Sequence, residues 1–221
     1  EVGLVDLPGT YSLTPYSEEE AAARAYLVED RPDAVIDVVD ANTLERGLYL
    51  ALQFLEMGTP LVLALNMMDE VRRKGMRIDS DKLAGLLNVP VVETVARQGL
   101  GREELVRQAV DFARERQGRM DPPPVSYGPD VDRALLDMEP VIRDAGILSH
   151  LPPRWVALQY LEGDETVHEA GRVRDFAAHA GLLETSRGLA DHLRRTMNMD
   201  LEAVIADYRY GYIASLLKQG V

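Results

Sequence analysis

Near-continuous apolar runs, separated by segments of helical periodicity, constrain the fold of this chain more than any other feature. Residues 34–39 and 61–65 are apolar at almost every position, as expected for strands that are covered on both faces. Residues 43–57 and 101–116 follow with apolar side chains at helical spacing. The other elements expected in this part are strands at 2–5 and 89–92 and helices at 17–29 and 79–87. Strands that alternate with helices predict an α/β fold with a mostly parallel sheet.

The pattern changes near residue 117, where a linker is expected. Residues 122–124 are three successive prolines, which favour an extended chain. Beyond them no strand is expected, and helical segments separated by glycine or proline predict a small all-α bundle. These segments are 130–145, 153–162, 165–180, 186–197 and 200–218. The sequence therefore predicts an α/β domain at 1–117, a linker at 118–129 and a helical domain at 130–221.

Charge and composition exclude several kinds of site and partner. The chain has 24 Lys and Arg against 37 Asp and Glu, and a net charge of −13 argues against binding to nucleic acid. It has no cysteine, which excludes disulfides and thiolate metal sites. No apolar run approaches the roughly 20 residues that cross a bilayer, so we expect a soluble chain. The histidines show no metal-ligand spacing and are expected in surface or capping roles: His150, His168, His179 and His192.

The stretch Asp6-Leu7-Pro8-Gly9 follows the first expected strand. A carboxylate at this place can hold a Mg²⁺-bound water, and the amide of a glycine can approach a γ-phosphate because no Cβ intervenes. Four residues of this kind are also an ordinary turn after a strand. By itself the stretch therefore leaves both interpretations open.

A second stretch, Asn66-Met67-Met68-Asp69, follows the strand expected at 61–65. The Asp69 carboxylate can accept hydrogen bonds from N1–H and N2–H₂ of guanine, and adenine offers no such pair of donors on that edge. Asn66 is expected to tie this loop to its neighbours. The alternative is that Asn66 and Asp69 only make a turn and cap the next helix.

A third stretch, Thr94-Val95-Ala96-Arg97, follows the strand expected at 89–92. Small side chains here allow backbone amides to reach the O6 atom of guanine, although the pattern alone is uninformative. The three stretches occur in the order that a GTPase domain requires, each after an expected strand. Their combination is far more specific than any one of them.

Three stretches closely resemble the cytoplasmic N-terminal region of ferrous iron transport protein B (FeoB): residues 6–13, 66–70 and 207–213. Residues 38–41 and 44–46 add to the resemblance, which runs over nearly the whole chain. It implies a GTPase domain followed by a helical domain that stabilises bound GDP. It also implies GTP or GDP and Mg²⁺ as cofactors, and a membrane-embedded iron permease in the same polypeptide as a partner. The resemblance therefore implies a location at the cytoplasmic face of the cell membrane. It leaves open whether the region forms homo-oligomers.

The resemblance also carries roles to individual residues. Asp6 and Gly9 match the third GTPase motif, where Asp6 holds Mg²⁺ through a water molecule. The guanine-specificity motif is matched by Asn66, Met67 and Asp69. The fifth motif is matched by Thr94, Val95 and Ala96. Met67 stands where many GTPases carry a lysine that packs on the base, which suggests modest nucleotide affinity.

Thr10 stands where many GTPases carry the glutamine that positions the attacking water. A glutamine-based hydrolysis mechanism is therefore not supported, and no catalytic residue is assigned. No histidine, acidic residue or methionine can be assigned to iron.

No phosphate-binding loop of the form Gly-x-x-x-x-Gly-Lys-Ser/Thr occurs in the 221 residues. We therefore expect an incomplete P-loop GTPase-type sheet that begins at the third strand of the family. The preferred explanation is that the chain is a fragment of a longer FeoB and hydrolyses GTP negligibly. The alternative is a remodelled protein that has lost hydrolysis.

The function expected from all of this is the guanine-nucleotide-binding regulatory region of a ferrous iron transporter, in which GTP hydrolysis by the complete protein regulates Fe²⁺ uptake. Two other functions are weighed against it. One is a non-catalytic interaction module that relays a conformational signal, and the other is a soluble GTPase associated with the ribosome or tRNA. The acidic charge argues against the last.

Overall fold

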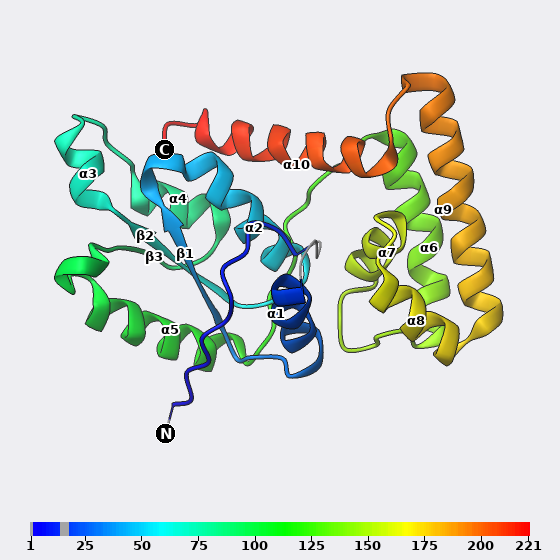
Figure 1. Cartoon of the computed structure of the whole chain (residues 1–221), viewed down its shortest axis with the longest axis horizontal. Helices are drawn as coiled ribbons and strands as arrows, with labels where there is room; N and C mark the ends of the chain where they lie inside the picture. Colours follow the sequence, from blue (N-terminus) through cyan, green and yellow to red (C-terminus); the bar gives the residue numbers. More distant parts are fainter. Residues whose placement is uncertain (1, 14–17) are drawn as a thin grey trace. The chain divides into compact units, whose positions relative to one another are not determined.

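The computed structural model describes residues 2–13 and 18–221 and divides the chain into two compact units (Figure 1). One unit is the chain up to Pro123 together with Tyr212–Val221, and the other is Pro124–Gly211. The sequence predicts that the last ten residues belong to the helical domain, whereas in the structure they group with the first unit. The boundaries at 117/118 and 129/130 stay predictions.

The first unit contains a three-stranded parallel sheet in the order β1-β2-β3. The strands are β1 (Val35–Asp40), β2 (Leu61–Asn66) and β3 (Val91–Glu93). Residues 61–65 of the central strand β2 are buried on both faces, which explains their unbroken apolar sequence. The predicted mixed α/β fold with a parallel sheet is confirmed.

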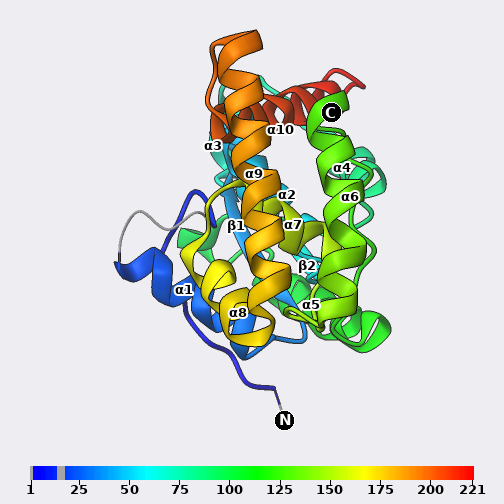
Figure 2. The ribbon, with the colours of Figure 1, turned by 90° about the vertical axis from the view of Figure 1, so that its right-hand side faces the viewer.

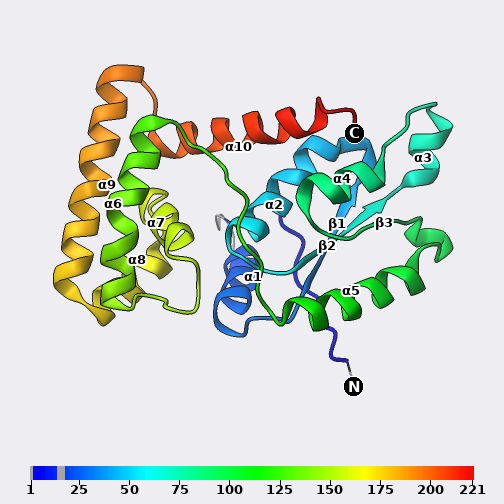
Figure 3. The same ribbon diagram turned by 180° about the vertical axis from the view of Figure 1, so that it is seen from behind.

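Helices lie on both faces of this sheet, but they leave Val38 of β1 60% exposed, so the expectation that residues 34–39 are covered on both faces is wrong for this strand. The helices of the unit are α1 (Glu18–Glu29), α2 (Leu44–Glu56), α3 (Met68–Arg73), α4 (Ser80–Leu87) and α5 (Arg102–Arg116). Figures 1 and 3 show α2 and α4 on one face and α5 on the other. The packing of α2 on β1 is close, because a Cβ at Gly47 would lie 2.1 Å from Cγ1 of Val39.

The strand expected at 2–5 is absent, so that prediction is wrong. The segment has no regular structure, and Val2, Leu4 and Val5 are 64%, 85% and 54% exposed. No strand of the described residues pairs with it, and a short apolar run without a ladder partner gains neither hydrogen bonds nor burial. The predicted cap of the following helix at Ser17 lies outside the described residues.

The second unit is entirely helical where it has regular structure. Its helices are α6 (Pro129–Ala145), α7 (Pro153–Leu161), α8 (Glu165–Arg174), α9 (Phe176–Met197) and most of α10 (Leu201–Leu217). Helix α6 contacts α7 and α9, and Figure 2 shows α6 and α9 side by side. No helix among the described residues is long and apolar enough to cross a membrane.

The end of α8 and the start of α9 differ from the sequence prediction. The break expected between residues 180 and 186 lies instead at Asp175, so α9 runs unbroken through Gly181. Asp175 has an extended backbone, and its carboxylate accepts a hydrogen bond from the Ala178 amide at 3.0 Å. A side-chain cap therefore starts the helix here, while an interior glycine costs only about 1 kcal/mol and does not end it.

A buried ion pair joins α10 to the end of α7 inside the helical unit. Arg209 is fully buried, and its Nη1 and Nη2 donate to Oε1 and Oε2 of Glu162 at 2.5 and 3.0 Å. Gln159 donates a further hydrogen bond to Oε2 at 3.0 Å. This fork-to-fork geometry satisfies both charges within a site that excludes water.

Removing one partner of this pair should destabilise the helical unit. We expect Arg209→Met to lower the free energy of unfolding by about 3–5 kcal/mol, because the Glu162 charge is left buried and unpaired. Urea unfolding followed by the fluorescence of Trp155 measures this, since Trp155 is the single tryptophan and is buried in the same unit. The control Arg133→Met breaks an exposed pair with Asp137 and should cost less than about 1 kcal/mol. Equal losses in the two variants would contradict the prediction.

Asp37 lies in the middle of β1, and its burial contrasts with that of the paired Arg209 and Glu162. Its side chain is buried, and its Oδ2 has no hydrogen-bond partner within the described part of the chain. Burial raises the pKa of Asp37 to about 7. The folded state therefore binds this proton more tightly than the unfolded state, whose pKa for the group is near 3.8.

The stability of the first unit should therefore depend on pH through Asp37. Below pH 3.8 the carboxyl is protonated in both the folded and the unfolded state, so its burial does not lower the free energy of unfolding through ionisation. As the pH rises toward 7, the unfolded state is ionised while the folded-state carboxyl still holds its proton, and the free energy of unfolding falls. We expect Asp37→Asn to stabilise the protein on the order of 2–4 kcal/mol at pH 8 and much less at pH 5. Calorimetric unfolding at the two pH values measures this, with the exposed Asp33→Asn as the control. A variant no more stable than the parent at pH 8 would refute it.

Candidate functional site

Two of the predicted loops meet at the carboxyl edge of the sheet. Asn66 ends β2, and Thr94 follows β3 directly. The side-chain Oδ1 of Asn66 accepts a hydrogen bond from the Ala96 amide at 3.0 Å and one from Thr94 Oγ1 at 3.4 Å. Because β2 and β3 are parallel neighbours, their ends are adjacent, and Asn66 ties the two loops together.

Met67 makes the sharp turn from β2 into α3. Its φ and ψ are 66° and 27°, the left-handed region that residues other than glycine seldom adopt. The Met67 carbonyl accepts hydrogen bonds from the amides of Glu70 and Val71 at 2.9 and 3.3 Å, which begins the helix. The Met67 side chain is left 40% exposed beside the loop.

Asp69 lies in the first turn of α3, and its carboxylate is ion-paired with Arg97. Partial burial acts to raise the pKa of Asp69, but the hydrogen bond and charge of Arg97 outweigh it, aided by the amides of Asp69 and Glu70. The net effect holds the pKa below its ordinary value. Asp69 is therefore an ionised acceptor at neutral pH.

The loop after β3 is closed by its own backbone. Val95 and Leu100 exchange amide-to-carbonyl hydrogen bonds at 3.1 and 3.3 Å, around a short 3₁₀ turn at Ala96–Gln98. Gly101 has a φ of 82°, and a Cβ there would lie 2.4 Å from the Glu93 carbonyl oxygen. Only glycine fits where the chain passes so close to the Glu93 carbonyl. This close approach helps to hold the loop that carries Arg97.

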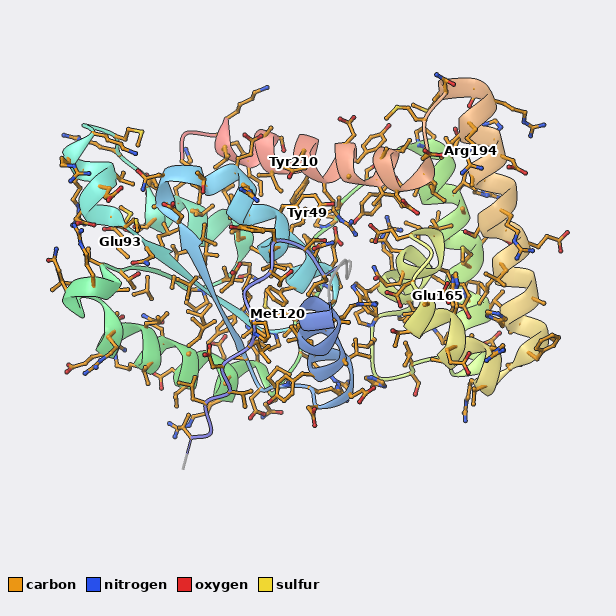
Figure 4. All side chains as sticks on the ribbon, in the orientation of Figure 1. Tyr49, Glu93, Met120, Glu165, Arg194 and Tyr210 are labelled. Carbon is orange, nitrogen blue, oxygen red and sulfur yellow. The ribbon has the colours of Figure 1, made fainter. Side chains whose placement is uncertain are left out.

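Glu93, labelled in Figure 4, ends β3 beside α3 and forms a second polar link. Its carboxylate accepts from Arg72 of α3 at 2.5 Å and from Ser80 Oγ at 3.0 Å. The last turn of α3 and the first residue of α4 are therefore connected to the end of β3. The sequence alone does not reveal this link, because it joins residues that no local pattern relates.

Asp6 and Gly9 are not among the residues that form the contacts between these two loops. Asp6 is exposed, and its side chain makes no hydrogen bond or ion pair within the described residues. A Cβ added at Gly9 would meet no atom within 4 Å. The end of their segment is anchored where the Leu13 amide donates to Gln53 of α2 at 2.8 Å. The roles of Asp6 and Gly9 stay predictions.

The histidines divide between the surface and the interior. The expectation of surface or capping roles is wrong for His179, which is buried in the helical unit with its Nδ1 3.1 Å from the Tyr160 hydroxyl. Burial, with His168 and Arg172 nearby, lowers the pKa of His179. Across the described ranges, no three histidine, aspartate or glutamate side chains converge to hold a metal ion.

Two family models match the chain and decide its membership. Residues 1–109 match the model described as ferrous iron transport protein B, and residues 127–221 match the FeoB cytosolic helical domain. The chain belongs to the FeoB family. This membership favours the iron-transport interpretation over a GTPase associated with the ribosome or tRNA.

The FeoB relatives are similar over almost the whole chain. A fusion of Fe(2+) transport protein A with the Fe(2+) transporter FeoB from Porphyromonas gingivalis is 40% identical over 99% of this chain. The Fe(2+) transporter FeoB of Escherichia coli K12 is 37% identical over 98%. The chain spans about a quarter of the length of these curated relatives, 26% in both cases.

Solved FeoB structures share the fold. The GDP form I of the T. maritima FeoB cytosolic domain has a TM-score of 0.76 and 32% identity, over 97% of this chain and 76% of that one. A GDP-bound variant of S. thermophilus NFeoB has a TM-score of 0.82 and 30% identity, over 96% and 78%. Another T. maritima structure is a GMPPNP form.

The tie between the loops can be tested through Asn66. We expect Asn66→Ala to raise the hydrogen-exchange rate of the Ala96 amide by about 3- to 10-fold, because that amide loses its acceptor. Amide exchange followed by NMR measures the change. The matched control Asn42→Ala removes an exposed amide that accepts from Lys74 and should leave Ala96 unchanged. Unaltered exchange at Ala96 in Asn66→Ala would show that the bond does not order the loop.

Proposed function

We propose that this chain is the guanine-nucleotide-binding regulatory region of a ferrous iron transporter. In the complete protein, GTP hydrolysis regulates Fe²⁺ uptake through a permease domain of the same polypeptide, with this region at the cytoplasmic face of the membrane. The observation that carries the proposal is the pair of loops joined by Asn66, which presents the ionised Asp69 at the carboxyl edge of a parallel sheet.

Asp69 is the residue that selects the base. Its ionised carboxylate accepts from N1–H and N2–H₂ of guanine, and these hydrogen bonds are charge-assisted. Adenine carries an acceptor at N1, which a carboxylate repels. The exposed Met67 side chain is apolar and offers a surface on which the flat base packs.

The Thr94, Val95 and Ala96 amides are the proposed donors to guanine O6, and all three already donate within the protein. Their acceptors are the Leu65 carbonyl at 2.7 Å, the Leu100 carbonyl at 3.1 Å and Asn66 Oδ1 at 3.0 Å. The first two bonds belong to the backbone framework of the loop. The Ala96 amide is therefore the one that can be shared with O6 at least cost, since its acceptor is a side chain.

Asp6 and Gly9 are the proposed residues for the phosphate end. Mg²⁺ keeps several waters and needs only one or two protein carboxylates beside phosphate oxygens. The exposed Asp6 carboxylate, which has no partner among the described residues, fits contact with such a water. The open space around Gly9 fits a close approach of its amide to phosphate. When bound, Mg²⁺ neutralises phosphate charge.

Hydrolysis requires groups that these 221 residues do not supply. The sequence contains no Gly-x-x-x-x-Gly-Lys-Ser/Thr loop to cradle the phosphates, and Thr10 stands in place of a water-positioning glutamine. We therefore propose that the chain alone hydrolyses GTP negligibly. Its part in the complete protein is to recognise the base and to link nucleotide binding to the helical unit.

A titration with fluorescent GDP tests the proposed recognition. We expect Asp69→Ala to weaken GDP binding by about 100-fold or more, because two charge-assisted hydrogen bonds of about 1.5–3 kcal/mol each are lost. ADP should compete poorly with GDP on the parent chain. The control Asp81→Ala removes an exposed carboxylate of α4 and should leave the affinity unchanged. Equal affinities for GDP and ADP, or an Asp69→Ala chain that binds as the parent does, would refute guanine recognition and favour a non-catalytic relay module.

A further inference from the structure

We propose that Arg97 competes with guanine for the Asp69 carboxylate and thereby sets the affinity of the site for guanine nucleotides. This inference rests on the proposed function, because it assigns to Asp69 the reading of the base. It adds a second residue that determines specificity, and one that acts by occupying the carboxylate before the base does.

The contact that carries the proposal joins the two loops of the site. Arg97 Nη2 donates to Asp69 Oδ2, while the Arg97 side chain is 64% exposed and that of Asp69 is 26% exposed. The guanidinium therefore covers the carboxylate from the solvent side, where it is free to leave. A base that approaches Asp69 from solvent meets the guanidinium first.

Backbone geometry holds Arg97 in reach of Asp69. The residue before it, Ala96, is tied to Asn66, and the loop is closed by the paired Val95 and Leu100. The Asn66–Thr94 and Asp69–Arg97 contacts both span 28 residues. Both contacts thus join matching positions of two loops that start at neighbouring strand ends.

The chemistry of the two donors explains the competition. A guanidinium presents adjacent, coplanar N–H donors, as does the edge of guanine with its N1–H and N2–H₂ groups. Arg97 occupies Oδ2 of the Asp69 carboxylate. A base that uses both oxygens must therefore displace Arg97, whereas a base with a single donor gains too little to do so.

A neighbouring pair provides a matched control. Arg72 is 65% exposed and pairs with Glu93, which is 30% exposed, at the same edge of the sheet. The Glu93 carboxylate has no proposed role in recognising the base. Arg72→Ala thus removes an arginine of equal exposure and an ion pair of equal kind without freeing Asp69.

The first measurement needs no nucleotide. A ¹³C NMR titration of the Asp69 carboxyl group should show its pKa rise in Arg97→Ala and stay unchanged in Arg72→Ala, because only Arg97 pairs with it. An unchanged Asp69 pKa in Arg97→Ala would mean that the ion pair is absent in solution and would overturn the inference.

The second measurement is titration of the 221-residue chain with GDP, inosine diphosphate and ADP. We expect Arg97→Ala to tighten GDP binding by about two- to fivefold, the range that loss of an exposed competing ion pair allows. The gain should be smaller for inosine diphosphate, which lacks the 2-amino donor, and absent for ADP. It should shrink as salt is raised, because salt already weakens the pair in the parent.

The outcomes separate this inference from the proposed function. GDP binding that depends on Asp69 but is equal in Arg97→Ala and the parent overturns the inference alone. The same tightening in Arg72→Ala also overturns it, since the effect is then general loss of positive charge. Absence of GDP binding in the parent and in every variant overturns the proposed function together with the inference.

Discussion

Parallel pairing of the buried strand β2 with both of its neighbours is the constraint on which the rest of the α/β unit depends. Residues 61–65 are buried on both faces, so helices must cover both sides and each connection must cross over. The pairing Leu65↔Glu93 then sets Asn66 beside Thr94. A one-residue slip in that register would separate the Asn66 side chain from the Ala96 amide.

Much of this could be predicted from the sequence, because the relevant signals are local. Apolar runs and helical spacing located all three strands and most helices, and polar residues at strand ends located the two loops. The Asp69–Arg97 contact could not be predicted, since it joins residues 28 positions apart whose proximity depends on the β2–β3 register. The prediction of a strand at 2–5 is wrong because its apolar pattern is that of a strand, but a strand also needs a neighbouring strand with which to pair.

Two buried charged residues show how pairing decides the cost of burial. Arg209 and Glu162 satisfy each other with two hydrogen bonds. Asp37 has no partner at Oδ2, so burial raises its pKa instead of ordering a network. Neither environment is visible in the sequence, where Asp37 interrupts an apolar strand and Arg209 stands between two tyrosines.

Helix α10 has a topological consequence. It begins in the helical unit and ends in the unit that holds the sheet, since Tyr212–Val221 group with the latter. The helical unit is thus an insertion in the chain of the α/β unit, which leaves it after Pro123 and re-enters it at Tyr212. No single cut divides the chain into two intact units. A tail added or removed at Val221 therefore acts first on the unit that carries Asp69, although that residue lies far away in sequence.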